Sequence, residues 1–110
     1  MISRRTLARG AIGFLIAAAA AKPARAQALQ VKIDNFTFNP QRLTVKAGTT
    51  VSWVNNDDIP HTVTAKNFLF KSKALDTGDG FSFTFAAPGT YDYFCSLHPH
   101  MTGSIVVEGS

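Results

Sequence analysis

Apolar and polar residues alternate along most of the chain from Leu29 onward. A period of two predicts strands that bury one face, and turn residues such as Ala87-Pro88-Gly89 separate them. The apolar positions of the predicted strands are Leu29, Val31, Ile33, Phe36, Phe38, Leu43, Val45, Val51, Trp53, Val63, Ala65, Phe81, Phe83, Phe85, Tyr91, Tyr93, Cys95, Ile105 and Val107. We therefore expect an all-β fold, an antiparallel β-sandwich of about eight strands.

Three connections are less regular than the strands. At Asn35 the alternation changes phase, which predicts a bulge or a bend from one sheet to the other. The apolar positions of the predicted strands before and after Lys46-Ala47-Gly48-Thr49 are all odd-numbered, which predicts a hairpin. The stretch from Lys66 to Gly80 has no clear period, and we expect a short edge strand at 68–70 and a helical turn over 71–75.

The first 26 residues have the pattern of an export signal. Ser3-Arg4-Arg5-Thr6-Leu7 is a twin-arginine start, and Ala24-Arg25-Ala26 supplies the small residues of a cleavage site. The apolar run between them, Gly10 to Ala21, is shorter than the roughly 20 residues that span a bilayer. We expect residues 1–26 to be removed on export to the periplasm. An uncleaved membrane anchor and a buried N-terminal helix are the alternatives.

Removal of this signal reverses the charge of the chain. The whole sequence has eleven basic and seven acidic residues and a formal net charge of +4. Five of the eleven basic residues and none of the acids lie within positions 1–26. Residues 27–110 therefore have six basic and seven acidic residues, a net charge of −1. Nucleic acid and anionic membrane are therefore not expected as partners, since both require a basic face. Residues 27–110 suffice for one domain, which we expect to be a monomer.

The clearest chemical signal is the order of Cys95, His98 and Met101, which places a thiolate, an imidazole and a thioether on one tight loop. A second imidazole, His61, lies far upstream, directly after Pro60. A Cys and two His with a weak axial Met form the electron-transfer copper set, because soft sulfur favours Cu(I) while imidazole binds both oxidation states. We predict one copper ion held by these four side chains.

Each of these residues has an ordinary alternative when it is taken alone. Cys95 is the single cysteine and cannot form an internal disulfide, but an inert buried thiol is common. His61 alone is more typical of a loop histidine, and Met101 alone of a core filler. Their combination at ligand spacing favours the metal. His100 should point away from the metal, as a solvated histidine at the rim.

These residues give the chain a resemblance to the cupredoxins, small blue copper proteins with a Greek-key β-sandwich. It is most similar to the amicyanin, pseudoazurin and plastocyanin group. The resemblance runs from about Val31 to Glu108 and rests on Val51-Ser52-Trp53-Val54-Asn55, Pro60-His61, Pro88-Gly89-Thr90-Tyr91-Asp92-Tyr93 and Cys95 to Met101. It implies the same four ligands, His61, Cys95, His98 and Met101, and a tyrosine corner at Tyr91.

Two departures from the family pattern bear on the site. Many relatives have Asn after the first histidine ligand to hold the loops together, and this chain has Thr62. We expect the backbone N–H of Thr62 still to donate to the Cys95 sulfur. His100 stands where amicyanin has an aromatic residue, which makes the rim more polar.

The resemblance implies electron transfer between periplasmic redox proteins, for example from a dehydrogenase or to a c-type cytochrome. In relatives the ring edge of the loop histidine, here His98, emerges through an apolar patch; Leu97, Pro99 and Phe36 or Phe38 would form it here. Four protein ligands leave no open position for a substrate, so an enzyme is not expected. A copper-delivery protein is the alternative, but several exposed Met or His ligands would suit that role better than one Met.

Overall fold

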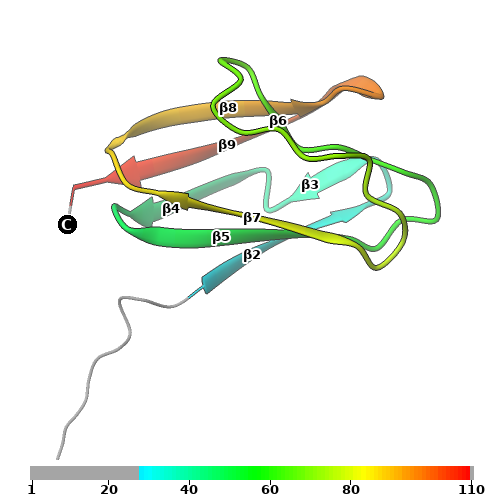
Figure 1. The fold of residues 1–110 in the computed structure, drawn as a ribbon, viewed down its shortest axis with the longest axis horizontal. Coiled ribbons are helices and arrows are strands. Elements are labelled where there is room, and N and C mark those ends of the chain that lie inside the picture. The colour runs from blue at the N-terminus through cyan, green and yellow to red at the C-terminus, as the bar shows by residue number, and fades with distance from the viewer. Residues whose placement is uncertain (1–27, 110) are drawn as a thin grey trace, which may run out of the picture.

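Two four-stranded β-sheets pack face to face in the computed structural model, which describes residues 28–109 (Figure 1). The strands are β2 (Ala28–Asp34), β3 (Thr37–Asn39), β4 (Arg42–Lys46), β5 (Thr49–Asn55), β6 (Thr64–Ala65), β7 (Gly80–Phe85), β8 (Gly89–Cys95) and β9 (His98–Glu108). The predicted eight-stranded sandwich is confirmed. The expected export signal, residues 1–26, lies outside the described residues. Within residues 28–109, no helix is long and apolar enough to cross a membrane.

Both sheets are mixed, so the sandwich is not antiparallel throughout as expected. The first has the order β3-β2-β5-β7 with β2 parallel to β5, and the second has the order β4-β9-β8-β6 with β4 parallel to β9. The predicted hairpin of β4 and β5 is therefore wrong, because these strands lie in different sheets. The period of two identifies the buried face of a strand but not its partner, and the inner faces of both sheets are apolar.

The phase change at Asn35 is a tight hairpin between β2 and β3, so the predicted bulge or bend between sheets is wrong. Asp34 pairs with Thr37, and the two residues between them have positive φ angles, 52° at Asn35 and 58° at Phe36. Positive φ at both central residues is the geometry of the primed turns that join antiparallel strands. The turn places Phe36 at the tip, with 48% of its surface exposed.

The segment between β6 and β7 forms neither the expected edge strand nor the helical turn. It runs beside the chain that leads into β6, through isolated bridges of Thr64 with Lys71 and of His61 with Leu75. In the second bridge, each backbone N–H donates to the other residue's carbonyl oxygen, at 3.1 and 2.7 Å. The segment therefore holds the backbone of His61 in place.

The core is aromatic at its centre. Trp53 and Tyr93, one from each sheet, are fully buried with ring centroids 5.4 Å apart. Phe85 is buried as predicted, while Phe81 and Phe83 are only partly buried. The tyrosine corner expected at Tyr91 is present: its hydroxyl donates to the carbonyl of Ala87 at 2.6 Å.

Gly103 makes room for the Tyr93 ring. The two residues pair across β8 and β9, and a Cβ at position 103 would overlap the ring and hydroxyl of Tyr93. We expect Gly103→Ala to lower the free energy of unfolding by about 1 to 3 kcal/mol, the usual cost of overpacking a core. Urea denaturation of the metal-free protein measures it. Gly109→Ala, where a Cβ meets nothing within 4 Å, is the matched control and should be near neutral.

Candidate metal centre

Three connections meet at one end of the sandwich: the β2–β3 turn, the β5–β6 loop and the β8–β9 turn (Figure 1). The loop carries His61, and the β8–β9 hairpin carries Cys95 and His98. The ligand atoms of these three residues all lie within 4.8 Å of one another. The Cys95 Sγ is 3.7 Å from Nδ1 of His61 and 3.6 Å from Nδ1 of His98. Three of the four predicted ligands are therefore brought together.

The β8–β9 hairpin explains how Cys95 and His98 become neighbours. They pair across the two-residue turn of Ser96 and Leu97, so β9 begins at His98, earlier than the sequence indicated. The register is irregular here, because Phe94 pairs with Thr102 while Cys95 pairs with His98. The three residues between His98 and Thr102 thus form a bulge on β9. Met101 is the buried member of this bulge, 5% exposed, and His100 is exposed as predicted.

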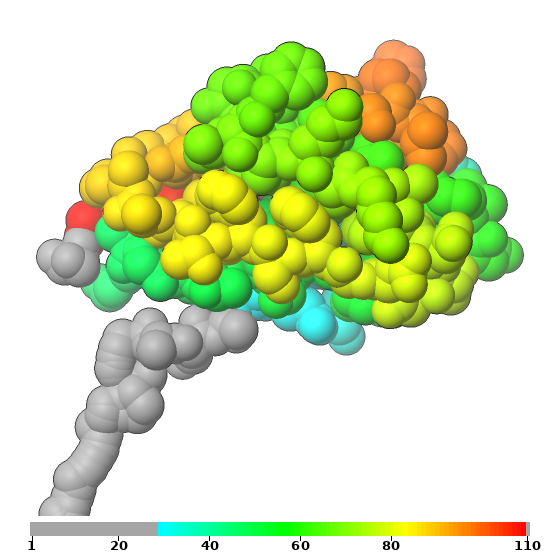
Figure 2. All heavy atoms as spheres, viewed as in Figure 1, coloured from blue at the N-terminus to red at the C-terminus, as the bar shows by residue number. Residues whose placement is uncertain are grey.

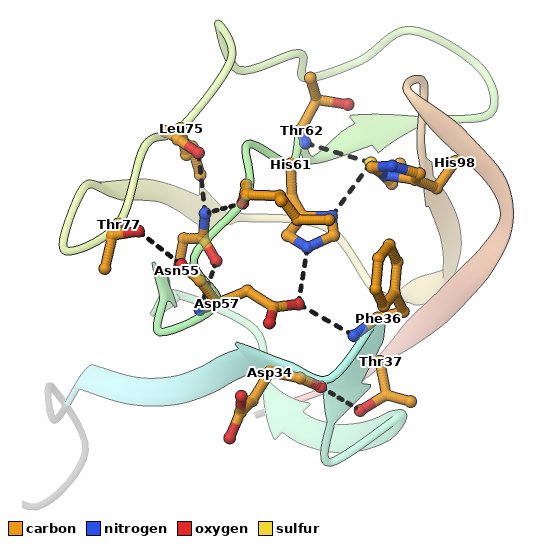
Figure 3. Close-up of polar contacts among 12 residues, drawn as sticks. Asp34, Phe36, Thr37, Asn55, Asp57, His61, Thr62, Leu75, Thr77 and His98 are labelled. Carbon is orange, nitrogen blue, oxygen red and sulfur yellow. Dashed lines mark hydrogen bonds and ion pairs between the residues drawn. The ribbon is translucent and has the colours of Figure 1, made fainter.

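His61 is fully buried and fixed on several sides (Figure 3). Its backbone pairs with Leu75, and its ring Nε2 lies 2.9 Å from a carboxylate oxygen of Asp57. The loop that carries it is closed by the buried amide of Asn55, which donates to the carbonyls of Ile59 at 2.9 Å and Leu75 at 2.8 Å. The imidazole therefore has one orientation, with Nδ1 toward Cys95.

Asp57 is a functional residue that the sequence did not reveal. Its Oδ2 also accepts a hydrogen bond from the backbone N–H of Phe36 at 3.0 Å. The pKa of Asp57 is lowered from its ordinary value, chiefly by that N–H and next by the ring of His61. An ionised acceptor at Nε2 requires the ring proton there, which leaves the Nδ1 lone pair facing the sulfur. The only sequence signal was an acid four residues before His61, in a loop of unknown shape.

Thr62 binds the two ligand loops together. Its backbone N–H donates to the Cys95 sulfur at 3.3 Å, as predicted. Its hydroxyl accepts the N–H of Ser96 at 2.7 Å and exchanges a second hydrogen bond with the Ser96 hydroxyl at 2.8 Å. Where many relatives are expected to use Asn to hold these loops together, this chain uses the hydroxyl of Thr62.

The rim of the site is partly apolar. Phe36 and Leu97 are 48% and 50% exposed, and the β8–β9 turn, orange in Figure 2, stands at the surface. Phe38 is 2% exposed and belongs to the core, so of the two candidates for this patch only Phe36 contributes. The Phe36 ring packs edge-on against both imidazoles, with centroids 5.5 Å from His61 and 5.1 Å from His98. His98 itself is half-buried.

The donor geometry fits a metal ion. Metal bonds of about 2.3 Å to sulfur and 2.0 Å to imidazole, separated by roughly 110 to 120°, place the nitrogen and sulfur about 3.6 Å apart. The two observed separations from the Cys95 sulfur are 3.6 and 3.7 Å. A soft thiolate, two imidazoles and a buried thioether on the same hairpin are the donor chemistry of an electron-transfer copper site.

Comparisons with known proteins found relatives that share this fold. A family model described as a cupredoxin-like domain matches residues 7–107. Amicyanin of Paracoccus versutus is 36% identical over 94 residues, which cover 81% of this chain and 71% of that protein. A purple cupredoxin of Nitrosopumilus maritimus superposes with a TM-score of 0.70 at 35% identity, over 73% of this chain and 99% of that one. An amicyanin variant solved in its Cu(I) form gives a TM-score of 0.69 at 36% identity, over 74% and 82%.

Removing the Thr62 hydroxyl should loosen the two ligand loops. We expect Thr62→Val to lower the free energy of unfolding by about 0.5 to 1.5 kcal/mol, because the N–H of Ser96 loses its acceptor in a partly buried hydrogen bond. Urea denaturation of the metal-free protein measures this. Thr84→Val is the control: it removes a hydroxyl from an exposed pair with Thr50 and should change little. Equal effects of the two substitutions would contradict a specific role for Thr62.

Proposed function

The chain belongs to the cupredoxin-like family, and on that premise we propose that it is a periplasmic carrier of single electrons that uses one blue copper ion. The copper is held by His61, Cys95, His98 and Met101. The observation that carries this proposal is the meeting of two imidazole nitrogens and one thiol sulfur within 4.8 Å, from two separate connections of the sandwich.

The bound copper supplies a centre that alternates between Cu(I) and Cu(II). The protein's part is to keep the ligands in one arrangement in both states. His61 is fixed by Asp57 and by its pairing with Leu75, and the Cys95 sulfur receives the N–H of Thr62. Burial of Cys95 and His61 excludes water from this side of the site. Little rearrangement is then needed when the electron arrives or leaves.

The half-buried His98 is the proposed point of electron entry and exit. It lies among the exposed side chains of Phe36 and Leu97, which give a small apolar contact area. Such a surface suits brief contact with a redox partner, because electron-transfer complexes bury little area. We propose a periplasmic dehydrogenase or a c-type cytochrome as the kind of donor or acceptor, and a monomer as the working form.

The periplasmic location rests on the sequence alone. The twin-arginine pattern at Ser3 to Leu7 and the small residues at Ala24 to Ala26 support export, which delivers the protein to a compartment of redox partners. Cleavage after about residue 26 leaves the cupredoxin domain, residues 27–110. Mass spectrometry of protein recovered from a periplasmic fraction tests this boundary.

Copper addition should produce an intense blue absorption band at one copper per chain. Cys95→Ser should abolish the band, since the thiolate is the donor that gives this chemistry its colour. His100→Gln is the matched control at the exposed rim and should keep the band. A protein that stays colourless but passes Cu(I) to an acceptor would support the copper-delivery alternative and contradict the carrier.

Met101→Leu should keep the blue band and raise the reduction potential. Loss of the thioether removes a weak axial donor, which destabilises Cu(II) more than Cu(I). Voltammetry of the copper-loaded variant measures the potential directly. A potential equal to that of the unaltered protein would remove Met101 from the axial position.

A further inference from the structure

We infer that Asp57 is a positioning residue of the copper site, whose carboxylate fixes the tautomer of His61, anchors the Phe36 turn over the site and favours the oxidised metal. This inference rests on the proposed function, because it assigns Asp57 a role toward a metal bound through His61. Three observations on separate parts of the chain lead to it.

The first is the bond geometry at His61. One carboxylate oxygen of Asp57 lies 2.9 Å from Nε2, on the side of the ring away from Cys95. A neutral imidazole has one N–H and one lone pair. With the N–H directed at the carboxylate, the lone pair lies on Nδ1, which faces the Cys95 sulfur at 3.7 Å. The tautomer that binds a metal is therefore set before any metal arrives.

The second is that the same oxygen binds the β2–β3 turn. Asp57 Oδ2 accepts the backbone N–H of Phe36 at 3.0 Å, and the Phe36 ring packs at right angles against the rings of His61 and His98 (Figure 3). One carboxylate oxygen thus joins a ligand to the aromatic side chain that lies over both imidazoles. Removal of this acceptor would therefore free both the His61 ring and the Phe36 turn.

The third is that Asp57 is itself held and shielded. Its N–H donates to the Asn55 side chain at 2.9 Å, and its carbonyl accepts the Thr77 hydroxyl at 2.6 Å. Its side chain is 13% exposed, which reduces but does not remove the screening of its charge by solvent. A fixed negative charge bonded to a ligand makes that ligand more basic and stabilises the more positive oxidation state. Asp57 should therefore lower the reduction potential.

Two substitutions separate the charge from the hydrogen bond. Asp57→Asn keeps an oxygen acceptor but removes the charge, and Asp57→Ala removes both. Asp58→Asn is the matched control, since it deletes the same charge from the adjacent exposed residue. The ring tautomer of His61 is observed by nitrogen-15 NMR in the metal-free protein, and the reduction potential is measured after copper loading.

We expect both Asp57 variants to raise the potential. A tenfold loss of Cu(II) affinity with Cu(I) affinity unchanged, at the low end of the effect of removing an outer-shell partner, corresponds to about 59 mV. In the metal-free protein, Asp57→Asn should keep the single Nε2–H tautomer and Asp57→Ala should lose it. Asp58→Asn should change neither measurement.

Two results would overturn the inference. One is an Asp57→Ala protein that retains the Nε2–H tautomer and the original potential. The other is an equal shift of the reduction potential in Asp58→Asn, which would show that the effect comes from the net charge of the loop and not from the contact of Asp57 with His61. Failure of the unaltered protein to bind copper would instead refute the proposed function, and the NMR result on the metal-free protein would still decide whether Asp57 orients His61.

Discussion

The structure depends on one constraint: an imidazole from the β5–β6 loop must reach a thiolate and an imidazole on the β8–β9 hairpin. The Cys95 sulfur meets both ring nitrogens at 3.6 to 3.7 Å because the loops are joined by hydrogen bonds of their own. Thr62 makes these bonds through its backbone and its hydroxyl. This link holds the two loops at a fixed separation.

The rest of the sandwich holds these loops at one end. Trp53 and Tyr93 join the two sheets at the centre, and Gly103 leaves the space that the tyrosine ring occupies. The irregular segment before β7 has no periodic pattern, yet it fixes the backbone of His61 through Leu75. A rigid frame of this kind suits electron transfer, in which the ligands should move little between oxidation states.

The sequence predicted the buried faces of the strands from their period of two. It also predicted three ligands that the structure brings together, Cys95 and His98 from their local spacing and His61 because it completes the copper donor set. It did not predict strand partners: equal parity across residues 46–49 fits a hairpin and a change of sheet equally well, and here the chain changes sheet. It also missed Asp57, because a contact between that loop acid, His61 and the Phe36 turn depends on tertiary structure. The hydroxyl role of Thr62 was hidden for the same reason.

The central claim is that these side chains already stand in the arrangement that copper requires. Crystal structures of the metal-free protein and the oxidised copper protein test it most directly. The account predicts one copper ion bonded to Nδ1 of His61, Nδ1 of His98 and the Cys95 sulfur, with the rings and backbone of both loops unmoved between the two structures. Copper bonded through Nε2 of His61, or a loop that rearranges to receive it, would contradict the account.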